Sequence, residues 1–115
     1  MSQPEYRTLR EFWPYYLSEH LNPVNRALHV VGSLGVLTLI GLAIGLRDPR
    51  YLIPTPFVGY GFAWVGHFVV EKNRPATFKY PLKSFLCDWI MLAKILTFRI
   101  GRDIAELEAP AKVVA

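Results

Sequence analysis

Two long stretches without a formal charge dominate the chain. The first runs from Ala27 to Leu46 and the second from Tyr51 to Val70, and each holds no Lys, Arg, Asp or Glu. A helix rises 1.5 Å per residue, so about twenty residues reach across the ~30 Å apolar core of a bilayer. Because only the short polar turn 47–50 joins them, the pattern predicts a membrane-embedded helical hairpin with spans 27–46 and 52–70.

Residues that favour helix ends refine these limits. Asn22 is a good helix cap and Pro23 is tolerated in a first turn, so the first helix is expected to begin near residue 23. Pro54 and Pro56 interrupt the second stretch, and regular helix is therefore expected from about Pro56, with Thr55 as its cap. The remaining helix of about sixteen residues reaches ~24 Å, slightly less than a full span.

Shorter helices are expected on both sides of the hairpin. Residues 9–21 are rich in Trp and Tyr, which suit a membrane–water boundary, and predict a short N-terminal helix. Apolar residues recur at three- and four-residue steps over 81–99, which predicts an amphipathic third helix that stops at Gly101. This helix could lie at the interface, pack on the hairpin or span the membrane.

The pattern as a whole predicts an all-α protein with one helical membrane domain over residues 1–115. A short helical piece is expected at 102–108, followed by a loose tail at 109–115. The composition agrees, because 52% of the residues are hydrophobic and only 19% are charged, against roughly 25% in soluble domains. The single cysteine excludes an internal disulfide and a cysteine zinc site.

The basic residues lie mainly outside the hairpin. Of the 13 Lys and Arg residues, only Arg47 and Arg50 fall in the turn between the two apolar stretches. Lys and Arg favour the cytoplasmic side of a membrane, so both termini are expected in the cytoplasm. The basic residues do not line one helix, and nucleic acid is therefore not an expected partner.

Three histidines are the main candidates for chemistry. His29 lies about two turns inside the first span and His67 one turn before the end of the second, which are level in an antiparallel hairpin. His20 precedes the first span, so all three imidazoles are expected on the face that carries the termini. Glu71 follows one helical turn after His67 on the same side. Neutral imidazoles with a carboxylate nearby suit iron(II), and polar groups at membrane depth usually mark function.

Five polar residues, Glu71 among them, have more than one possible role. Asp88 either pairs with Arg26 or Lys72, or holds the second nitrogen of a histidine. Asn25 and Glu71 are further candidates, either as metal ligands or as partners that orient the histidines. Asn25 could equally be an ordinary interfacial polar residue, and residues 71–74 could be a solvated helix end. From charge alone, Arg26 or Lys72 could meet a substrate carboxylate.

Two blocks of sequence resemble a known family. They are YYLSEHLNPVNRALHVVG at 15–32 and GYGFAWVGHFVVEKNRPATFKYPLKSFLCDWIM at 59–91. These blocks resemble the small, membrane-associated Mpo-like family, formerly a domain of unknown function, over roughly residues 12–100. A fungal member of that family acts in the conversion of phytosphingosine to odd-numbered fatty acids. This chain resembles the short, bacterial type, which implies a bacterial inner membrane as its location.

The resemblance implies an iron(II)-dependent dioxygenase that shortens a 2-hydroxy fatty acid by one carbon and releases CO2. The histidines that would hold Fe2+ map onto His20, His29 and His67. The expected partners are then the lipid bilayer, a fatty-acyl substrate and O2. A second copy of the chain, in a homo-oligomer, is a further candidate partner. An acyl tail needs an apolar groove, for which the glycine-bearing hairpin and its aromatic residues Phe62, Trp64 and Phe68 are candidates.

Two alternatives remain at this point. The chain could be a non-enzymatic small helical membrane protein with interfacial histidines, or a soluble helical bundle with a very apolar hairpin. The oxygenase hypothesis requires the three imidazoles to lie within reach of one ion. Rings separated by well over about 10 Å could not share a metal, whose bonds to histidine nitrogen are close to 2 Å.

Overall fold

The computed structural model describes residues 6–75 and 78–108, and all regular structure in this part of the chain is helical. The expected all-α class is confirmed, with no strand among the described residues. The predicted loose tail at 109–115 lies outside the described residues. The α-helices are α1 (Leu9–Ser18), α2 (Pro23–Gly45), α3 (Thr55–Val65), α4 (Pro81–Leu96) and α5 (Ile100–Glu108).

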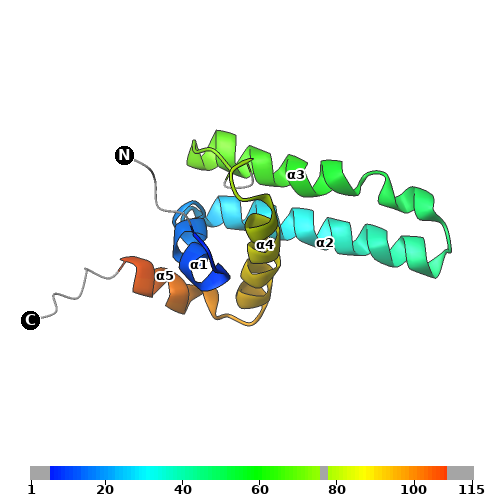
Figure 1. The fold of residues 1–115 in the computed structure, drawn as a ribbon. Coiled ribbons are helices and arrows are strands. Elements are labelled where there is room, and N and C mark those ends of the chain that lie inside the picture. Colours follow the sequence, from blue (N-terminus) through cyan, green and yellow to red (C-terminus); the bar gives the residue numbers. More distant parts are fainter. Residues whose placement is uncertain (1–5, 76–77, 109–115) are drawn as a thin grey trace, which may run out of the picture.

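Helices α2 and α3 form an antiparallel hairpin that extends from the rest of the molecule (Figure 1). As expected, α2 begins at Pro23, and the Asn22 side chain caps it by accepting a hydrogen bond from the Val24 backbone N–H at 2.8 Å. Glycines allow the two helices to approach closely. A Cβ at Gly35 would lie 2.8 Å from Val58 Cγ1, so a larger residue there would push α3 away.

The second arm of the hairpin is less regular than the single span predicted over 52–70. It consists of a 3-10 turn (Pro49–Leu52), α3 and a π-helix (Gly66–Glu71). Regular helix begins at Thr55, one residue before the expected start, and Pro54 occupies the cap position. The Thr55 hydroxyl does not cap α3 but donates backwards to the Leu52 carbonyl at 2.7 Å.

Among the described helices, only α2 is long and apolar enough to cross a membrane by length and composition. Helix α3 has 11 residues, about 16 Å at the rise of an α-helix, and falls short of a bilayer core. The hairpin itself is therefore present, and one of its two arms meets the criteria for a membrane span.

Helices α1, α4 and α5 pack together at the end of the hairpin away from its turn, and α4 crosses the hairpin (Figure 1). Phe12 and Tyr16 of α1 and Cys87 and Met91 of α4 form the buried core of this region. Of the three placements open to the third helix, packing on the hairpin is the one in this structure. Helix α4 buries the side that carries Cys87 and Met91, and much of its predicted apolar stripe is exposed.

The end of the third helix differs from the predicted 81–99. Helix α4 ends at Leu96, and Phe98 adopts a left-handed conformation with φ 60°. Gly101 does not stop a helix but lies in the first turn of α5, so the stop assigned to it was wrong. The turn forms at non-glycine residues, which leave no glycine signal for it in the sequence.

Candidate metal centre

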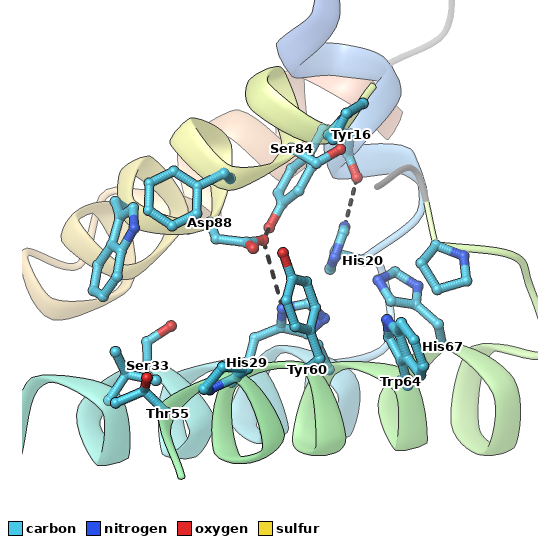
Figure 2. Close-up of a pocket in the computed structure, with 18 residues that line it drawn as sticks. Tyr16, His20, His29, Ser33, Thr55, Tyr60, Trp64, His67, Ser84 and Asp88 are labelled. Carbon is cyan, nitrogen blue, oxygen red and sulfur yellow. Dashed lines mark hydrogen bonds and ion pairs between the residues drawn. The ribbon is translucent and has the colours of Figure 1, made fainter. Parts of the chain in front are cut away.

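The three histidines converge at the point where α1, α2 and the π-helix meet (Figure 2). The ring centroids are 4.5 Å apart for His20 and His29, 4.4 Å for His20 and His67, and 5.1 Å for His29 and His67. All three rings are buried, and one nitrogen of each lies within 4.8 Å of the others. The three could therefore hold one metal ion.

Local structure delivers each ring to this point. His20 follows directly after α1, and its backbone N–H bonds to the Leu17 carbonyl at 2.9 Å. His29 lies in the second turn of α2. His67 belongs to the π-helix, whose wider turn changes the direction of side chains relative to α3.

Gly66 allows the π-helix to approach α2. A Cβ at Gly66 would lie 1.8 Å from the Oδ1 atom of Asn25, so either the Asn25 side chain or one of the two helices would have to shift. Asn25 is fully buried at this contact. The absence of a side chain at Gly66 therefore positions the neighbouring His67 next to His29.

Two of the rings are oriented through their Nδ1 atoms. His20 Nδ1 lies 2.6 Å from the Tyr16 carbonyl, and His67 Nδ1 lies 2.7 Å from Asn73 Oδ1. The Asn73 amide is itself oriented, because its Nδ2 donates to the Glu19 carbonyl at 3.1 Å. Both partners are acceptors, so each Nδ1 carries the proton and each Nε2 keeps a free lone pair.

Two of the Nε2 atoms have no partner in the protein. The Nε2 atoms of His20 and His29 are buried and make no hydrogen bond. A buried polar atom without a partner destabilises a fold by about 1–3 kcal/mol, so such atoms mark a missing ligand or a strained site. Burial, together with the two neighbouring imidazoles, lowers the pKa of His20 well below its ordinary value and keeps the ring neutral, as metal binding requires.

Asp88 lies on the opposite side of the site, on α4. Its Oδ1 is 3.7 Å from His29 Nδ1 and accepts a hydrogen bond from the Tyr16 hydroxyl. Asp88 thus faces a histidine and not Arg26 or Lys72, which decides between the two roles left open by the sequence. Burial raises the pKa of Asp88 to about 6, and the Tyr16 hydrogen bond opposes this rise.

Glu71 and Asn25 stabilise the scaffold around the histidines. Glu71 Oε1 accepts hydrogen bonds from the Asn22 backbone N–H at 2.6 Å and from Asn25 Nδ2 at 3.4 Å. These contacts join the end of the π-helix to the beginning of α2. Among the described residues, the cluster of close ligand atoms consists of the three histidines and does not include Glu71.

The two basic residues considered for a substrate carboxylate lie outside the cavity described below. Arg26 Nη1 donates to the carbonyls of His20 and Leu21, both at 2.8 Å, and so closes the turn before α2. Lys72 is exposed and ends the π-helix in a left-handed conformation with φ 60°. Neither residue lines the cavity beside the histidines.

A cavity of about 210 Å³ adjoins the three histidines and runs between α4 and the hairpin. Its lining is polar at the histidines, with Tyr16 and Asp88, and mostly apolar elsewhere. Trp64 lines it as expected of the apolar groove, whereas Phe62 and Phe68 do not.

Sequence reasoning did not identify two residues of this site. Tyr16 was interpreted as a boundary aromatic and Asn73 as part of a solvated helix end. Asn73 could have been noticed as an amide near a candidate ligand, since it follows His67 by six residues. The contact of Tyr16 with Asp88 crosses 72 residues and has no local signal.

Comparison with known proteins gave one match. A family model described as "2-hydroxy-palmitic acid dioxygenase Mpo1-like" matches residues 6–100, which is most of the chain and includes all three histidines. No curated protein and no solved structure matches the chain.

Proposed function

The chain belongs to the Mpo1-like family, and from this membership and the histidine cluster we propose that it is an iron(II)-dependent dioxygenase acting on 2-hydroxy fatty acids. The proposed reaction converts R–CH(OH)–COOH and O2 into R–COOH, CO2 and H2O. Carbon, hydrogen and oxygen balance, and O2 accepts all four electrons from the substrate. No external reductant is therefore required.

The observation that carries this proposal is the convergence of three buried imidazoles, two of which have a buried Nε2 atom without a partner. A set of three neutral nitrogen ligands suits a first-row metal and leaves positions for other ligands. When bound there, iron(II) would supply a Lewis acid for the two oxygens of a 2-hydroxy carboxylate and a site for O2 activation. His20, His29 and His67 would hold it.

The other residues of the site have supporting roles in this proposal. The Tyr16 carbonyl and Asn73 fix the His20 and His67 rings, and Asp88 faces Nδ1 of His29. Such partners orient ligand rings and raise their basicity. The adjoining cavity, mostly apolar in its lining, would receive the acyl chain and exclude bulk water from the polar end.

Burial of the histidines favours this proposal over the non-enzymatic alternative. Interfacial histidines would expose their rings to headgroups and water, as amphipathic side chains do at a boundary. Here His20 keeps 1% of its surface exposed, His29 6% and His67 2%. Three buried imidazoles that surround a common point are better explained by a shared ligand.

We also propose that the hairpin is embedded in a membrane, from which a fatty acid would be drawn. Large apolar side chains near its turn are exposed, including Ile44 at 73%, Ile53 at 68% and Phe57 at 78%. Exposed apolar surface of this kind is favourable in lipid and unfavourable in water. A bacterial inner membrane with both termini in the cytoplasm is the predicted setting.

Metal and product analysis tests the proposed function. The protein is purified in detergent without oxygen, and we expect about one iron per chain, lost in His20→Ala, His29→Ala or His67→Ala. Supplied with 2-hydroxyhexadecanoic acid and O2, it should release pentadecanoic acid and CO2. Wild-type protein with no more iron than the three variants, or an unchanged substrate with iron bound, would contradict the proposal.

A further inference from the structure

The cavity beside the histidines has two chemically different ends. Asp88 and the imidazoles line it where α4 meets the histidines, and Val36, Pro56 and Gly59 line it farther along the hairpin. Figure 2 shows Ser33 and Thr55 at the end away from His20 and His67, and the Thr55 hydroxyl is bonded to the Leu52 carbonyl. A ligand that fills the whole cavity should therefore be polar at the histidines and mostly apolar beyond them.

Small residues of α3 keep the apolar part open. Gly59 and Ala63 both line the cavity and are four residues apart, which places them on one face of the helix. A Cβ at Gly59 would meet only Val36 Cγ2, at 3.3 Å, among atoms within 4 Å. Phe85 and Trp89 of α4 also line the cavity. The other lining residues of this stretch of α3 are the aromatic Tyr60 and Trp64. The slot therefore has aromatic side chains from both helices, and the small residues of α3 leave space between them.

The positions of the lining residues give the length of this slot. His29 and Val36 both line it and are seven residues apart on α2, which corresponds to about 10 Å along the helix. In an extended alkyl chain, C–C bonds of about 1.5 Å advance roughly 1.25 Å each. The slot therefore accommodates about eight carbons between the histidines and Gly59.

We infer that this slot binds the first part of an unbranched acyl chain, and that Ala63 and Gly59 determine how many carbons it accepts. The inference rests on the proposed function, which places the polar head of the acid at the histidines. Ala63 precedes His67 by four residues and Gly59 precedes it by eight, or about 6 Å and 12 Å along the helix. A large side chain at Ala63 would thus shorten the slot more than one at Gly59.

Binding of 2-hydroxy acids of increasing length tests this inference. Iron-loaded protein is kept free of oxygen so that no turnover occurs, and the dissociation constant is measured by equilibrium dialysis for acids of four to twelve carbons. In the wild-type protein each added carbon should strengthen binding about four-fold until the slot is filled near eight carbons. An affinity independent of chain length over this range would overturn the inference.

Two variants locate the slot within the protein. In Gly59→Leu the twelve-carbon acid should bind at least ten-fold more weakly, and the four-carbon acid should bind as before. In Ala63→Leu the loss should begin at shorter acids than in Gly59→Leu. Gly61→Leu is the matched control, because a Cβ at Gly61 meets nothing within 4 Å. Equal losses in Gly59→Leu and Gly61→Leu would overturn the inference.

The iron content separates this inference from the proposed function. Both variants leave the three histidines intact and should keep the wild-type iron content and helical circular dichroism. If Gly59→Leu does not fold, Ala63→Leu alone still tests the shortened slot. Iron-loaded protein that binds no 2-hydroxy acid of any length would contradict the proposed function, whereas binding that ignores both substitutions would contradict only the slot.

Discussion

At the scale of single residues, hydrogen-bond acceptors on the outer side of the site orient the imidazole rings. His20 and His67 each direct Nδ1 to an oxygen acceptor and leave Nε2 for the centre. Tyr16 combines two roles, since its carbonyl accepts from His20 and its hydroxyl donates to Asp88. Its ring also stacks on His20, with centroids 4.1 Å apart and planes inclined by 23°.

A substitution at Asn73 tests whether these hydrogen-bond acceptors orient the rings. Asn73→Ala removes the acceptor for His67 Nδ1, so the ring should lose its fixed tautomer and orientation. We expect the affinity for a divalent metal to fall about 10- to 100-fold, which is typical for loss of such a partner. Competition with a chelator of known affinity measures the change.

Arg74→Ala is the control for this prediction, because Arg74 is exposed in the same segment. It should leave the metal affinity unchanged. Equal affinities for Asn73→Ala and the wild-type protein would mean that Asn73 does not orient the ring.

At the scale of elements, the π-helix at the end of the second arm has the largest consequence for the site. It carries His67 and ends at Glu71, whose side chain accepts from the Asn22 backbone N–H at the start of α2. Gly66 provides the close contact between these elements. π-Helical turns are frequent at functional sites because they redirect side chains within a helix.

Gly66→Ala should therefore disturb both stability and the metal site. The added Cβ overlaps Asn25 Oδ1, and relief requires the buried Asn25 side chain to turn away or the π-helix and α2 to move apart. We expect destabilisation by about 1–3 kcal/mol, as for other overpacked sites, together with weaker metal binding. Thermal unfolding in detergent, followed by circular dichroism, measures the first effect.

Gly61→Ala is the matched comparison on α3, where the new Cβ meets open space. Replacement of a helical glycine by alanine there should stabilise the fold by up to about 1 kcal/mol. A Gly66→Ala protein as stable as the Gly61→Ala protein would show that the close contact with Asn25 is not required.

At the scale of the whole molecule, the hairpin and the helices packed at its end divide the structure into two parts. The buried core lies between α1 and α4, whereas many apolar side chains of α2 and α3 are exposed. The histidines lie where these parts meet, and the cavity leads from them along the hairpin. The polar centre, the apolar slot and the lipid-compatible surface thus follow one another along the molecule. The proposed function requires this arrangement, because the substrate would enter from a bilayer.

Membrane association is the prediction that belongs to this scale. After expression and cell breakage, the full chain should sediment with membranes, resist extraction by alkaline carbonate and dissolve in detergent. Ile53→Glu combined with Phe57→Glu places charge on the exposed tip and should weaken this association. Recovery of the wild-type chain in the soluble fraction without detergent would favour the soluble-bundle alternative.

Much of the architecture follows from the sequence by itself. Charge-free stretches, Asn22 and Pro23 act within a few residues of where they stand, so they located α2 and the hairpin. The same local reasoning placed His20, His29 and His67 at one level, because the depth of a residue in a hairpin depends only on its distance from the turn. The rings are within about 5 Å of one another, as that reasoning required.

Only the tertiary structure decided what surrounds those rings. Whether Asp88 faces His29 or a basic residue, and which side of α4 is buried, depends on how α4 crosses the hairpin, and no local pattern encodes that angle. The π-helix and the left-handed turn at Phe98 likewise have no signal in the local sequence. Short-range sequence determines a capped helix start such as that of α2, whereas contacts between distant residues are selected by packing of the complete fold.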